Sequence, residues 1–320
     1  MAGDVTLQEW TREYELVDSA AAPRTTQEGR PIPVTVPIEL AAGVRVVYTS
    51  RLGGSSQGDF ASLNLGGKGG DDPSAVLANR SALAAVIGAP LALVSQVHSG
   101  RALDADQVGP DDLADLGVIE ADGLVCARPG IALGMFAADC LPVLLADPQA
   151  GVIGAAHCGR RGLERGIIAA TVELMLSKGA QVSAIVATLG PSICGDCYEV
   201  GESLSAAFNQ QFAGTATSTR FGGPGIDLAQ AACQELRAAG VEHIVDSAGR
   251  VAAASQYLQE DEELARLCDQ DGEGPSLQER MQGLRNPLCT LENPLWYSHR
   301  RAALAGKSHE GRMLALIVRS

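Results

Sequence analysis

The sequence predicts a mixed α/β fold in which buried strands alternate with amphipathic helices. Short apolar runs of strand length occur throughout the chain, for example LPVLLA at 141–146 and GVIGAA at 151–156. Longer stretches, such as DPSAVLANRSALAAVIG at 72–88, carry apolar residues at helical spacing. Strands outnumber helices and the two kinds are interleaved, which is typical of a mixed class. With 320 residues, 46% of them hydrophobic, the chain can bury a sizeable core.

Residues at the ends of each pattern place the individual elements. Asp72 is a candidate N-cap of the first helix, Gly179 ends a helix over 162–179, and Asp227 begins one that stops at Gly240. Strands are expected in the apolar runs at 44–49, 91–99, 122–127, 131–137, 141–146, 151–156, 182–190, 241–247 and 312–320.

Two further segments are expected to lie outside the core of the single domain. Residues 1–40 mix charges, threonines and prolines without strong periodicity, which predicts an N-terminal extension. Residues 252–288 are highly charged and helix-prone, which predicts a surface insertion. The remaining chain within 41–320 is predicted to form the one catalytic domain.

The charge balance limits which partners are plausible. The chain has 38 acidic and 24 basic residues, a formal net charge of −14, so a global basic surface for nucleic acid is absent and an anionic membrane would repel it. The polar, acidic N-terminus is not expected to be a signal peptide, and no apolar run approaches the roughly 20 residues of a membrane span. We expect a cytoplasmic protein, a monomer or weak homodimer, with its eight cysteines mostly reduced.

A cysteine and a histidine stand at matched places on two neighbouring strands. Cys140 precedes the run at 141–146 and His157 follows the run at 151–156, while Asp147, Pro148 and Gly151 break the chain between the two runs. A hairpin would bring both side chains to the same end of a sheet. His98, at the end of LALVSQVHS, is a third candidate. Two imidazoles and one thiolate form the ligand set of a catalytic zinc site whose fourth position is open.

Other ligand assignments remain open at this stage. Copper also accepts two histidines and a cysteine, but the chain has only five histidines, too few for a four-copper laccase. The CGDC sequence at 194–197 is a lone CxxC with no partner pair, so either a structural loop or a redox or metal site fits it. Arg51, Arg161 and Arg300 are candidate anion ligands, because guanidinium binds phosphate through a bidentate fork.

Several segments, in order, resemble one enzyme family. TSRLGGSS, FASLNLG, SQVHSG, DGLV, ADCLPVLLAD, AAHCGRRGL, LGPSICGDCYEVG and YSHRRA are similar to the multifunctional purine nucleoside phosphorylase family, also labelled YfiH-like, polyphenol oxidase, laccase-domain or peptidoglycan editing factor. The resemblance covers about residues 43–320. It implies a four-layer α/β/β/α sandwich and a zinc ion bound by His98, Cys140 and His157.

The resemblance also implies an activity. The expected reaction is phosphorolysis of adenosine, inosine, guanosine and methylthioadenosine, with adenosine deamination by a zinc-activated water as a second activity. Nucleoside and phosphate would be the small-molecule partners. The residues expected to bind them are Arg51, Asn64, Gln96, Asp139, Arg161 and Arg300. Two rival hypotheses are hydrolysis of an amide in a cell-wall precursor and a zinc-stabilised protein without catalysis.

The chain departs from the family pattern after the second histidine. Cys158, Gly159 and Arg160 stand where the family usually has Ala-Gly-Trp. The substitution removes an aromatic wall and introduces Cys158 as a further candidate ligand.

Overall fold

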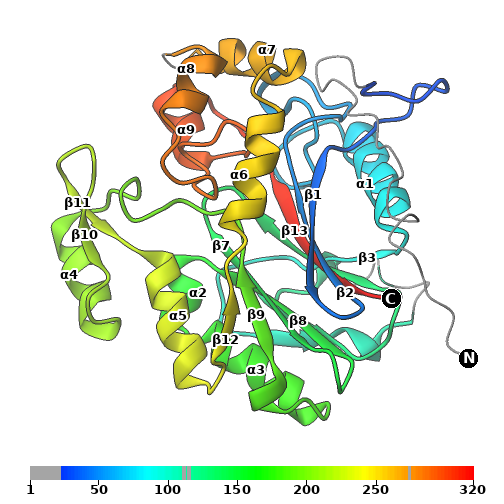
Figure 1. The fold of residues 1–320 in the computed structure, drawn as a ribbon, viewed down its shortest axis with the longest axis vertical. Coiled ribbons are helices and arrows are strands. Elements are labelled where there is room, and N and C mark those ends of the chain that lie inside the picture. Colours follow the sequence, from blue (N-terminus) through cyan, green and yellow to red (C-terminus); the bar gives the residue numbers. More distant parts are fainter. Residues whose placement is uncertain (1–22, 110–112, 114–116, 273–274) are drawn as a thin grey trace, which may run out of the picture.

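Two mixed β-sheets pack face to face, and helices cover the outer face of each sheet (Figure 1). The computed structural model describes residues 23–109, 113, 117–272 and 275–320. Apolar side chains from both sheets form one buried cluster between them, and separate clusters join each sheet to its own helices. This arrangement confirms the predicted mixed α/β class and the layer order helix, sheet, sheet, helix.

The first sheet has five strands in the order β1-β2-β13-β6-β3. Alternation of side chains along the strands gives this sheet two apolar faces. Val46 and Tyr48 point into the core between the sheets, whereas Val47 points toward α1. The strands are β1 Thr35–Ala41, β2 Val44–Thr49, β3 Leu91–Ala92, β6 Ala132–Ala137 and β13 Met313–Arg319.

The second sheet has six strands in the order β12-β9-β7-β8-β5-β4. Its centre is the predicted hairpin of β7 and β8, in which Pro142 lies opposite His157. The Asp147 carboxylate accepts the N–H groups of Gln149 and Ala150, which fixes the turn between them. The strands are β4 Ala102–Asp104, β5 Gly123–Cys126, β7 Leu141–Asp147, β8 Val152–Cys158, β9 Val186–Leu189 and β12 His243–Val245.

Helix α1, Pro73–Ile87, covers the first sheet and begins and ends at the predicted residues. The Asp72 side chain accepts the Ser74 N–H, and Gly88 adopts the left-handed conformation. The helix predicted over 162–179 is divided into α2, Arg160–Glu164, and α3, Ile167–Ser177, because Gly166 has a φ of 72°. α3 covers the second sheet together with α5, Leu228–Ala238, which is capped by Asp227 as predicted.

Smaller elements complete the described chain. Helix α4, Glu202–Gln211, packs on a two-stranded ribbon of β10, Ala216–Ser218, and β11, Pro224–Ile226. Helix α9, His299–Leu304, precedes the last strand. Short 3₁₀ turns lie at Gly58–Phe60, Ala105–Gln107 and Val182–Ala184, among others. Within the described residues, no helix is long and apolar enough to cross a membrane.

The sheet begins earlier than the sequence predicted. Residues 35–40 fall in the range expected to be an extension, but they form most of β1, which pairs with β2. Val36 and Leu40 are buried in the core between the sheets. Arg24 also contacts the folded domain through ion pairs with Asp261 and Glu263. Only residues 1–22 of the predicted extension lie outside the described residues.

The prediction that residues 252–288 lie on the surface, outside the core, is wrong, whereas their predicted helical character is confirmed. Most of this segment is helical, in α6 Ala248–Tyr257, α7 Glu262–Asp271 and α8 Leu277–Gln282. Leu264, Leu267, Cys268 and Leu277 are all buried against the core between the sheets. The high charge of α7 misled the sequence analysis because its apolar residues occupy only one face of that helix.

A buried ion pair fastens α7 to the loop after β2. Both Arg51 guanidinium ends contact the Asp271 carboxylate, at 2.8 and 3.2 Å. The guanidinium also lies over the Tyr297 ring, 5.5 Å from its centre. Burial alone would raise the pKa of Asp271, but the positive charges of Arg51 and Arg301 hold it well below its usual range. The Arg51 side chain therefore serves to hold α7 in place.

Truncation of Leu267 should destabilise the protein strongly. Leu267→Ala removes a buried side chain from the packed face of α7, so the free energy of unfolding should fall by about 2–5 kcal/mol. Leu77→Ala is the matched control, because Leu77 is 67% exposed on α1. Urea unfolding measures both variants, and equal small losses would show that α7 does not dock on the core.

Asp271 should make stability depend on pH in the acid range. Its pKa is lowered in the folded state, so its contribution is present above the unfolded pKa of about 3.9 and is lost as pH falls toward the folded pKa. Asp271→Asn should cost about 3–5 kcal/mol near neutral pH, because Arg51 loses its partner. The difference from the parent protein should shrink as pH falls through 4.

The control for this pH dependence is Asp269→Asn, which removes an exposed carboxylate from the same helix. Its unfolding free energy, measured over the same pH range, should run parallel to that of the parent protein. A difference between Asp271→Asn and the parent that stays constant down to pH 2 would contradict the assignment.

Candidate metal centre and substrate cavity

Three predicted ligands meet at one edge of the second sheet. Cys140 immediately precedes β7, His157 is the penultimate residue of β8, and His98 lies in the loop before β4. The Cys140 Sγ lies 3.6 Å from the His98 Nε2, and the two imidazole ring centres are 4.8 Å apart. One ligand atom from each residue lies within 4.8 Å of the others. The hairpin thus brings the two matched residues together as its spacing predicted.

The Asp122 carboxylate fixes both histidines. It accepts a hydrogen bond from the His157 Nδ1 at 2.8 Å and from the His98 backbone N–H at 3.0 Å. The Ser99 N–H and hydroxyl donate to it as well, at 2.6 and 2.7 Å. Because Nδ1 of His157 is engaged, its Nε2 is the nitrogen available as a ligand.

This network explains why the strand predicted over 91–99 is so short. Only Leu91–Ala92 pairs in the sheet, and Ser95 forms an isolated bridge with Glu120. The backbone then turns around Asp122, and His98 adopts a φ of 60°, which a residue other than glycine rarely does. The backbone N–H groups of His98 and Ser99 therefore bind the Asp122 carboxylate where a strand would bind a neighbouring strand. This contact places the His98 side chain in the site.

The electrostatics of the site favour a thiolate. Burial alone would raise the pKa of Cys140, but the charge of His157 and hydrogen bonds from both histidines lower it to about 6. Burial would lower the pKa of His157, but the charges and hydrogen bonds of Cys140 and Asp122 raise it to about 9. A bound cation would take the place of the imidazolium proton beside the thiolate.

The site has the donors and the space that a metal ion needs. Two imidazole nitrogens and a thiolate sulfur suit a divalent transition metal, with a fourth position left for another ligand. Gly159 borders the donors so closely that a Cβ there would lie 2.9 Å from both the Cys140 Sγ and the His98 Cδ2. A glycine is therefore required beside the ligand atoms.

Cys158 is not part of this ligand set. Neighbouring residues of a strand point to opposite faces, so Cys158 faces away from His157. It is buried in the apolar cluster between the second sheet and its helices. The expectation that Cys158 competes as a ligand is wrong.

Asp139 holds the backbone next to Cys140 in a strained conformation. Its φ is 96°, which is unusual for any residue except glycine. One carboxylate oxygen accepts the Thr290 hydroxyl at 2.6 Å and the other accepts the Arg300 N–H at 2.7 Å. With both oxygens engaged, Asp139 positions the cysteine and is poorly placed to transfer a proton.

A cavity of about 910 Å³ opens beside the three ligands. Its walls combine apolar and aromatic side chains with four basic ones, and two acidic side chains also line it. The apolar and aromatic group includes Phe136, Ile193, Tyr198 and Leu228, the basic group is Lys68, Arg80, Arg300 and Arg312, and the acidic group is Asp139 and Glu310. The volume and the mixed lining suit a polar small molecule with one flat apolar part.

Four of the predicted binding residues line this cavity, namely Asn64, Gln96, Asp139 and Arg300. The Gln96 amide exchanges hydrogen bonds with the Phe136 backbone, at 2.9 and 2.7 Å, and so supports that wall. The Asn64 amide oxygen accepts N–H groups from Gly66 and Arg312, both at 2.9 Å. Asn64 and Gln96 therefore shape the cavity.

The structure does not bring Arg51 and Arg161 into the cavity. Arg51 is buried in its ion pair with Asp271, and Arg161 is exposed on α2. Neither residue contributes to the lining, and no described residue of the segment 252–288 does so either. That segment packs on the core without forming a lid over this cavity.

Sequence reasoning missed the cations that are available for an anion. Lys68 and Arg80 line the cavity, and within the described chain neither has an ion pair with a carboxylate. Lys68 donates to the Ser95 hydroxyl, and the Arg80 Nε donates to the Leu65 carbonyl at 2.8 Å. Lys68 lies in the glycine-rich loop GGKGG, and that loop is the one signal that could have drawn attention to it.

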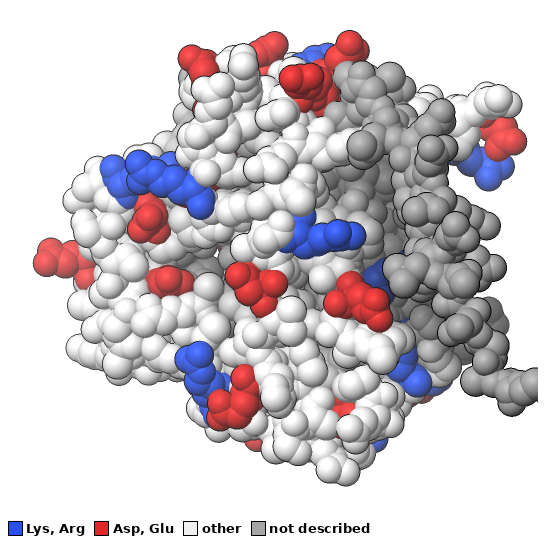
Figure 2. Space-filling model, in the orientation of Figure 1, with Lys and Arg blue, Asp and Glu red and all other residues white. Residues whose placement is uncertain are grey.

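Charges of both signs are mixed on the described part of the face of the molecule drawn in Figure 2. The cluster of basic residues in the cavity is thus a local feature of an acidic chain.

Comparison with known proteins places the chain among enzymes of one family. A family model described as multi-copper polyphenol oxidoreductase laccase matches residues 45–261. A purine nucleoside phosphorylase of Mycobacterium tuberculosis is 38% identical over 267 residues, covering 82% of this chain and 89% of that protein. An adenosine deaminase, RL5, from an unknown prokaryotic organism is 38% identical over 180 residues, covering 52% of this chain and 66% of that protein.

Solved structures agree with this placement. YlmD from Geobacillus stearothermophilus is 28% identical with a TM-score of 0.67, covering 93% of this chain and 99% of that one. YfiH from Bacillus licheniformis is 25% identical with a TM-score of 0.69, covering 90% of this chain and 97% of that one. From the matched family model and these relatives, we conclude that the chain belongs to the YfiH-like family, whose model carries the description multi-copper polyphenol oxidoreductase laccase.

Proposed function

We propose that this protein is a zinc-dependent purine nucleoside phosphorylase that also deaminates adenosine. The observation that carries the proposal is the ligand triangle of His98, Cys140 and His157 at the edge of a cavity lined by cations and aromatic rings. The names of the relatives, purine nucleoside phosphorylase and adenosine deaminase, point to the same chemistry. Adenosine, inosine, guanosine and methylthioadenosine are the proposed substrates.

Zinc suits this donor set of two imidazoles and one thiolate. His98 and His157 would bind it through Nε2 and Cys140 through Sγ, and the contact between Asp122 and the Nδ1 of His157 is the usual support of a zinc-bound imidazole. When bound, zinc supplies Lewis acidity and lowers the pKa of water at its open position. A multicopper centre needs more imidazoles than the two in this cluster.

Arg300 is the proposed main contact of phosphate. Its guanidinium donates to the Glu199 carbonyl at 2.8 Å and lies over the Tyr198 ring, 5.7 Å from the centre. Within the described chain it has no ion pair with a carboxylate. A fixed, unpaired guanidinium that borders the cavity can bind an oxyanion through its remaining N–H groups.

The apolar walls suit the purine base. Phe136 and Tyr198 offer aromatic faces, and Leu228 adds aliphatic surface. Flat heteroaromatic rings gain from offset or edge-to-face contacts with such side chains. Stacking on Tyr198 would place the base near Arg300, so one wall serves both the base and the phosphate.

Product analysis with adenosine tests the proposal. With phosphate present, the purified protein should release free adenine and ribose 1-phosphate, and it should form inosine with or without phosphate. Adenine formed equally fast without phosphate would make the enzyme a hydrolase. No turnover of any nucleoside, together with release of an amino acid from a muramyl precursor, would favour the cell-wall amidase instead.

Loss of the Asp122 carboxylate should weaken the metal site. Asp122→Asn presents an amide that cannot accept all the N–H groups now bound there, so metal affinity should fall about 10–100-fold. Competition with a chromophoric chelator measures this affinity. Asp106→Asn is the control, since Asp106 supports the same sheet through Lys178 and Arg128 but has no contact with a ligand. Equal losses in both variants would mean that the effect is general destabilisation.

Replacement of Arg300 should affect phosphate selectively. In Arg300→Gln the KM for phosphate should rise at least about tenfold, as expected for the loss of a charged hydrogen bond, while the KM for adenosine changes little. Arg161→Gln tests the other candidate, because the sequence analysis named both Arg161 and Arg300, whereas only Arg300 lines the cavity. A raised phosphate KM in Arg161→Gln alone would overturn the choice of Arg300.

A further inference from the structure

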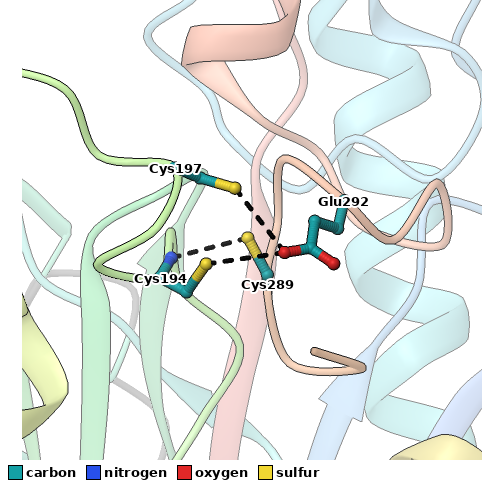
Figure 3. Close-up of side chains that lie close together, drawn as sticks. All are labelled: Cys194, Cys197, Cys289 and Glu292. Atoms are coloured by element: carbon teal, nitrogen blue, oxygen red, sulfur yellow. Dashed lines mark hydrogen bonds between the residues drawn. The ribbon is translucent and has the colours of Figure 1, made fainter. Parts of the chain in front are cut away.

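A second cluster of metal-binding side chains lies outside the ligand triangle. Cys194, Cys197, Cys289 and Glu292 each present a ligand atom, and these four atoms lie within 4.8 Å of one another (Figure 3). The CGDC turn was a lone CxxC in the sequence. The fold supplies the missing partners from a segment about 95 positions further along, where Cys289 and Glu292 have the same spacing.

Backbone hydrogen bonds hold the two segments together. Ser192 and Cys289 form a parallel bridge, in which the Ser192 N–H donates to the Leu288 carbonyl and the Thr290 N–H donates to the Ser192 carbonyl, both at 3.0 Å. The CGDC turn is closed by the N–H groups of Cys197 and Tyr198, which donate to the Cys194 carbonyl at 3.0 and 2.9 Å. The arrangement of the four ligands is therefore built into the backbone.

The sulfur atoms and one carboxylate oxygen converge on a common point. The Sγ atoms of Cys194 and Cys197 lie 3.7 and 3.6 Å from the Glu292 Oε1, and the Cys194 N–H donates to the Cys289 Sγ at 3.4 Å (Figure 3). A tetrahedral ion with a metal–sulfur bond of about 2.3 Å and a metal–oxygen bond of about 2.0–2.2 Å separates the sulfur from the oxygen by about 3.5–3.7 Å. The two observed sulfur–oxygen distances meet this requirement.

Glu292 is held with one carboxylate oxygen facing the cysteines. Its Oε2 accepts the N–H groups of Arg285 and Asn286, at 2.9 and 3.1 Å. Its Oε1 faces the sulfurs and also forms an ion pair with Arg220. The side chains of Cys197 and Cys289 are fully buried, and that of Glu292 is 4% exposed. Arg220 already compensates the charge of this buried carboxylate, so three thiolates beside it would need a further cation.

We propose that Cys194, Cys197, Cys289 and Glu292 bind a second zinc ion, separate from the one at the cavity. Three thiolates select a soft or borderline metal, and a tetrahedral set of sulfur and oxygen donors suits zinc. Four protein ligands leave no open position, so this site is structural. Arg220 offsets part of the negative charge that three thiolates and a carboxylate leave around a divalent ion.

The position of the cluster indicates a structural role for this ion. The two segments that it joins both hold Asp139, since the Ile193 N–H donates to the Asp139 carbonyl at 3.0 Å and the Thr290 hydroxyl donates to its carboxylate. Asp139 is the strained residue next to Cys140. The second ion therefore stabilises the backbone that presents the first site.

Metal content per chain tests the second site. Protein purified under reducing conditions from zinc-supplemented cells should carry about two zinc ions by elemental analysis. Cys140→Ala, which removes a ligand from the cavity site alone, should retain about one. Cys194→Ser combined with Cys289→Ser should also retain about one, and the control Cys233→Ser, at a half-buried cysteine outside both clusters, should retain both.

A cobalt spectrum identifies the ligands without disrupting the cluster. Cys140→Ala loaded with Co²⁺ should show the intense near-ultraviolet thiolate-to-metal absorption of a three-sulfur tetrahedral site, and Glu292→Gln in the same background should shift the visible bands while the protein stays folded. One zinc ion in the parent that Cys140→Ala removes completely would overturn the proposal. So would iron in place of zinc, or a disulfide among these cysteines in the reduced preparation.

The two metal assignments fail in different ways. Zinc retained at one ion per chain in both the parent and Cys140→Ala would support the cysteine cluster and count against zinc at the cavity. One zinc ion per chain in the parent and none in Cys140→Ala would support zinc at the cavity and count against the cysteine cluster.

Discussion

The buried carboxylate of Asp122 is the contact on which the candidate metal centre depends. It lies at the start of β5 and joins the end of β8 to the loop that carries His98. A buried carboxylate is tolerated only when donors surround it, and here an imidazole, backbone N–H groups and a hydroxyl do so. Burial would raise the pKa of Asp122, but hydrogen bonds from His157 and Ser99 hold it well below its usual range. These contacts fix the position of His98 and leave Nε2 as the available ring nitrogen of His157.

The parts of the fold that the sequence predicted correctly are governed by local patterns. The hairpin of β7 and β8 follows from two apolar runs and a turn, and its register brings Cys140 and His157 together. Asp72 and Gly88 bound α1 as their capping chemistry predicts. Two of the three residues in the ligand triangle could be predicted for the same reason, because Cys140 and His157 flank this hairpin. His98 was a candidate because it ends an apolar run, but no local rule predicts that the chain turns around Asp122 to bring it to the site.

What the sequence could not predict depends on contacts between distant residues. Arg51 looks like any exposed cation near a strand end, and only the fold brings Asp271 to it across 220 positions. The helix α7 has few apolar residues, so its charge hides the narrow face that docks on the core. The CGDC turn becomes part of a candidate metal site only because the fold brings Cys289 and Glu292 next to it. Lys68 and Arg80 likewise become candidate anion ligands because loop packing places them in the cavity.

We propose that zinc occupies the triangle of His98, Cys140 and His157 beside the cavity. Anomalous diffraction from a crystal of the purified protein, recorded on both sides of the zinc absorption edge, tests it most directly. Bound zinc should give a peak bonded to the Nε2 atoms of both histidines and to the Cys140 Sγ, present only above the zinc edge. A peak there that is also present between the copper and zinc edges, or no peak within bonding distance of these three atoms, would contradict it.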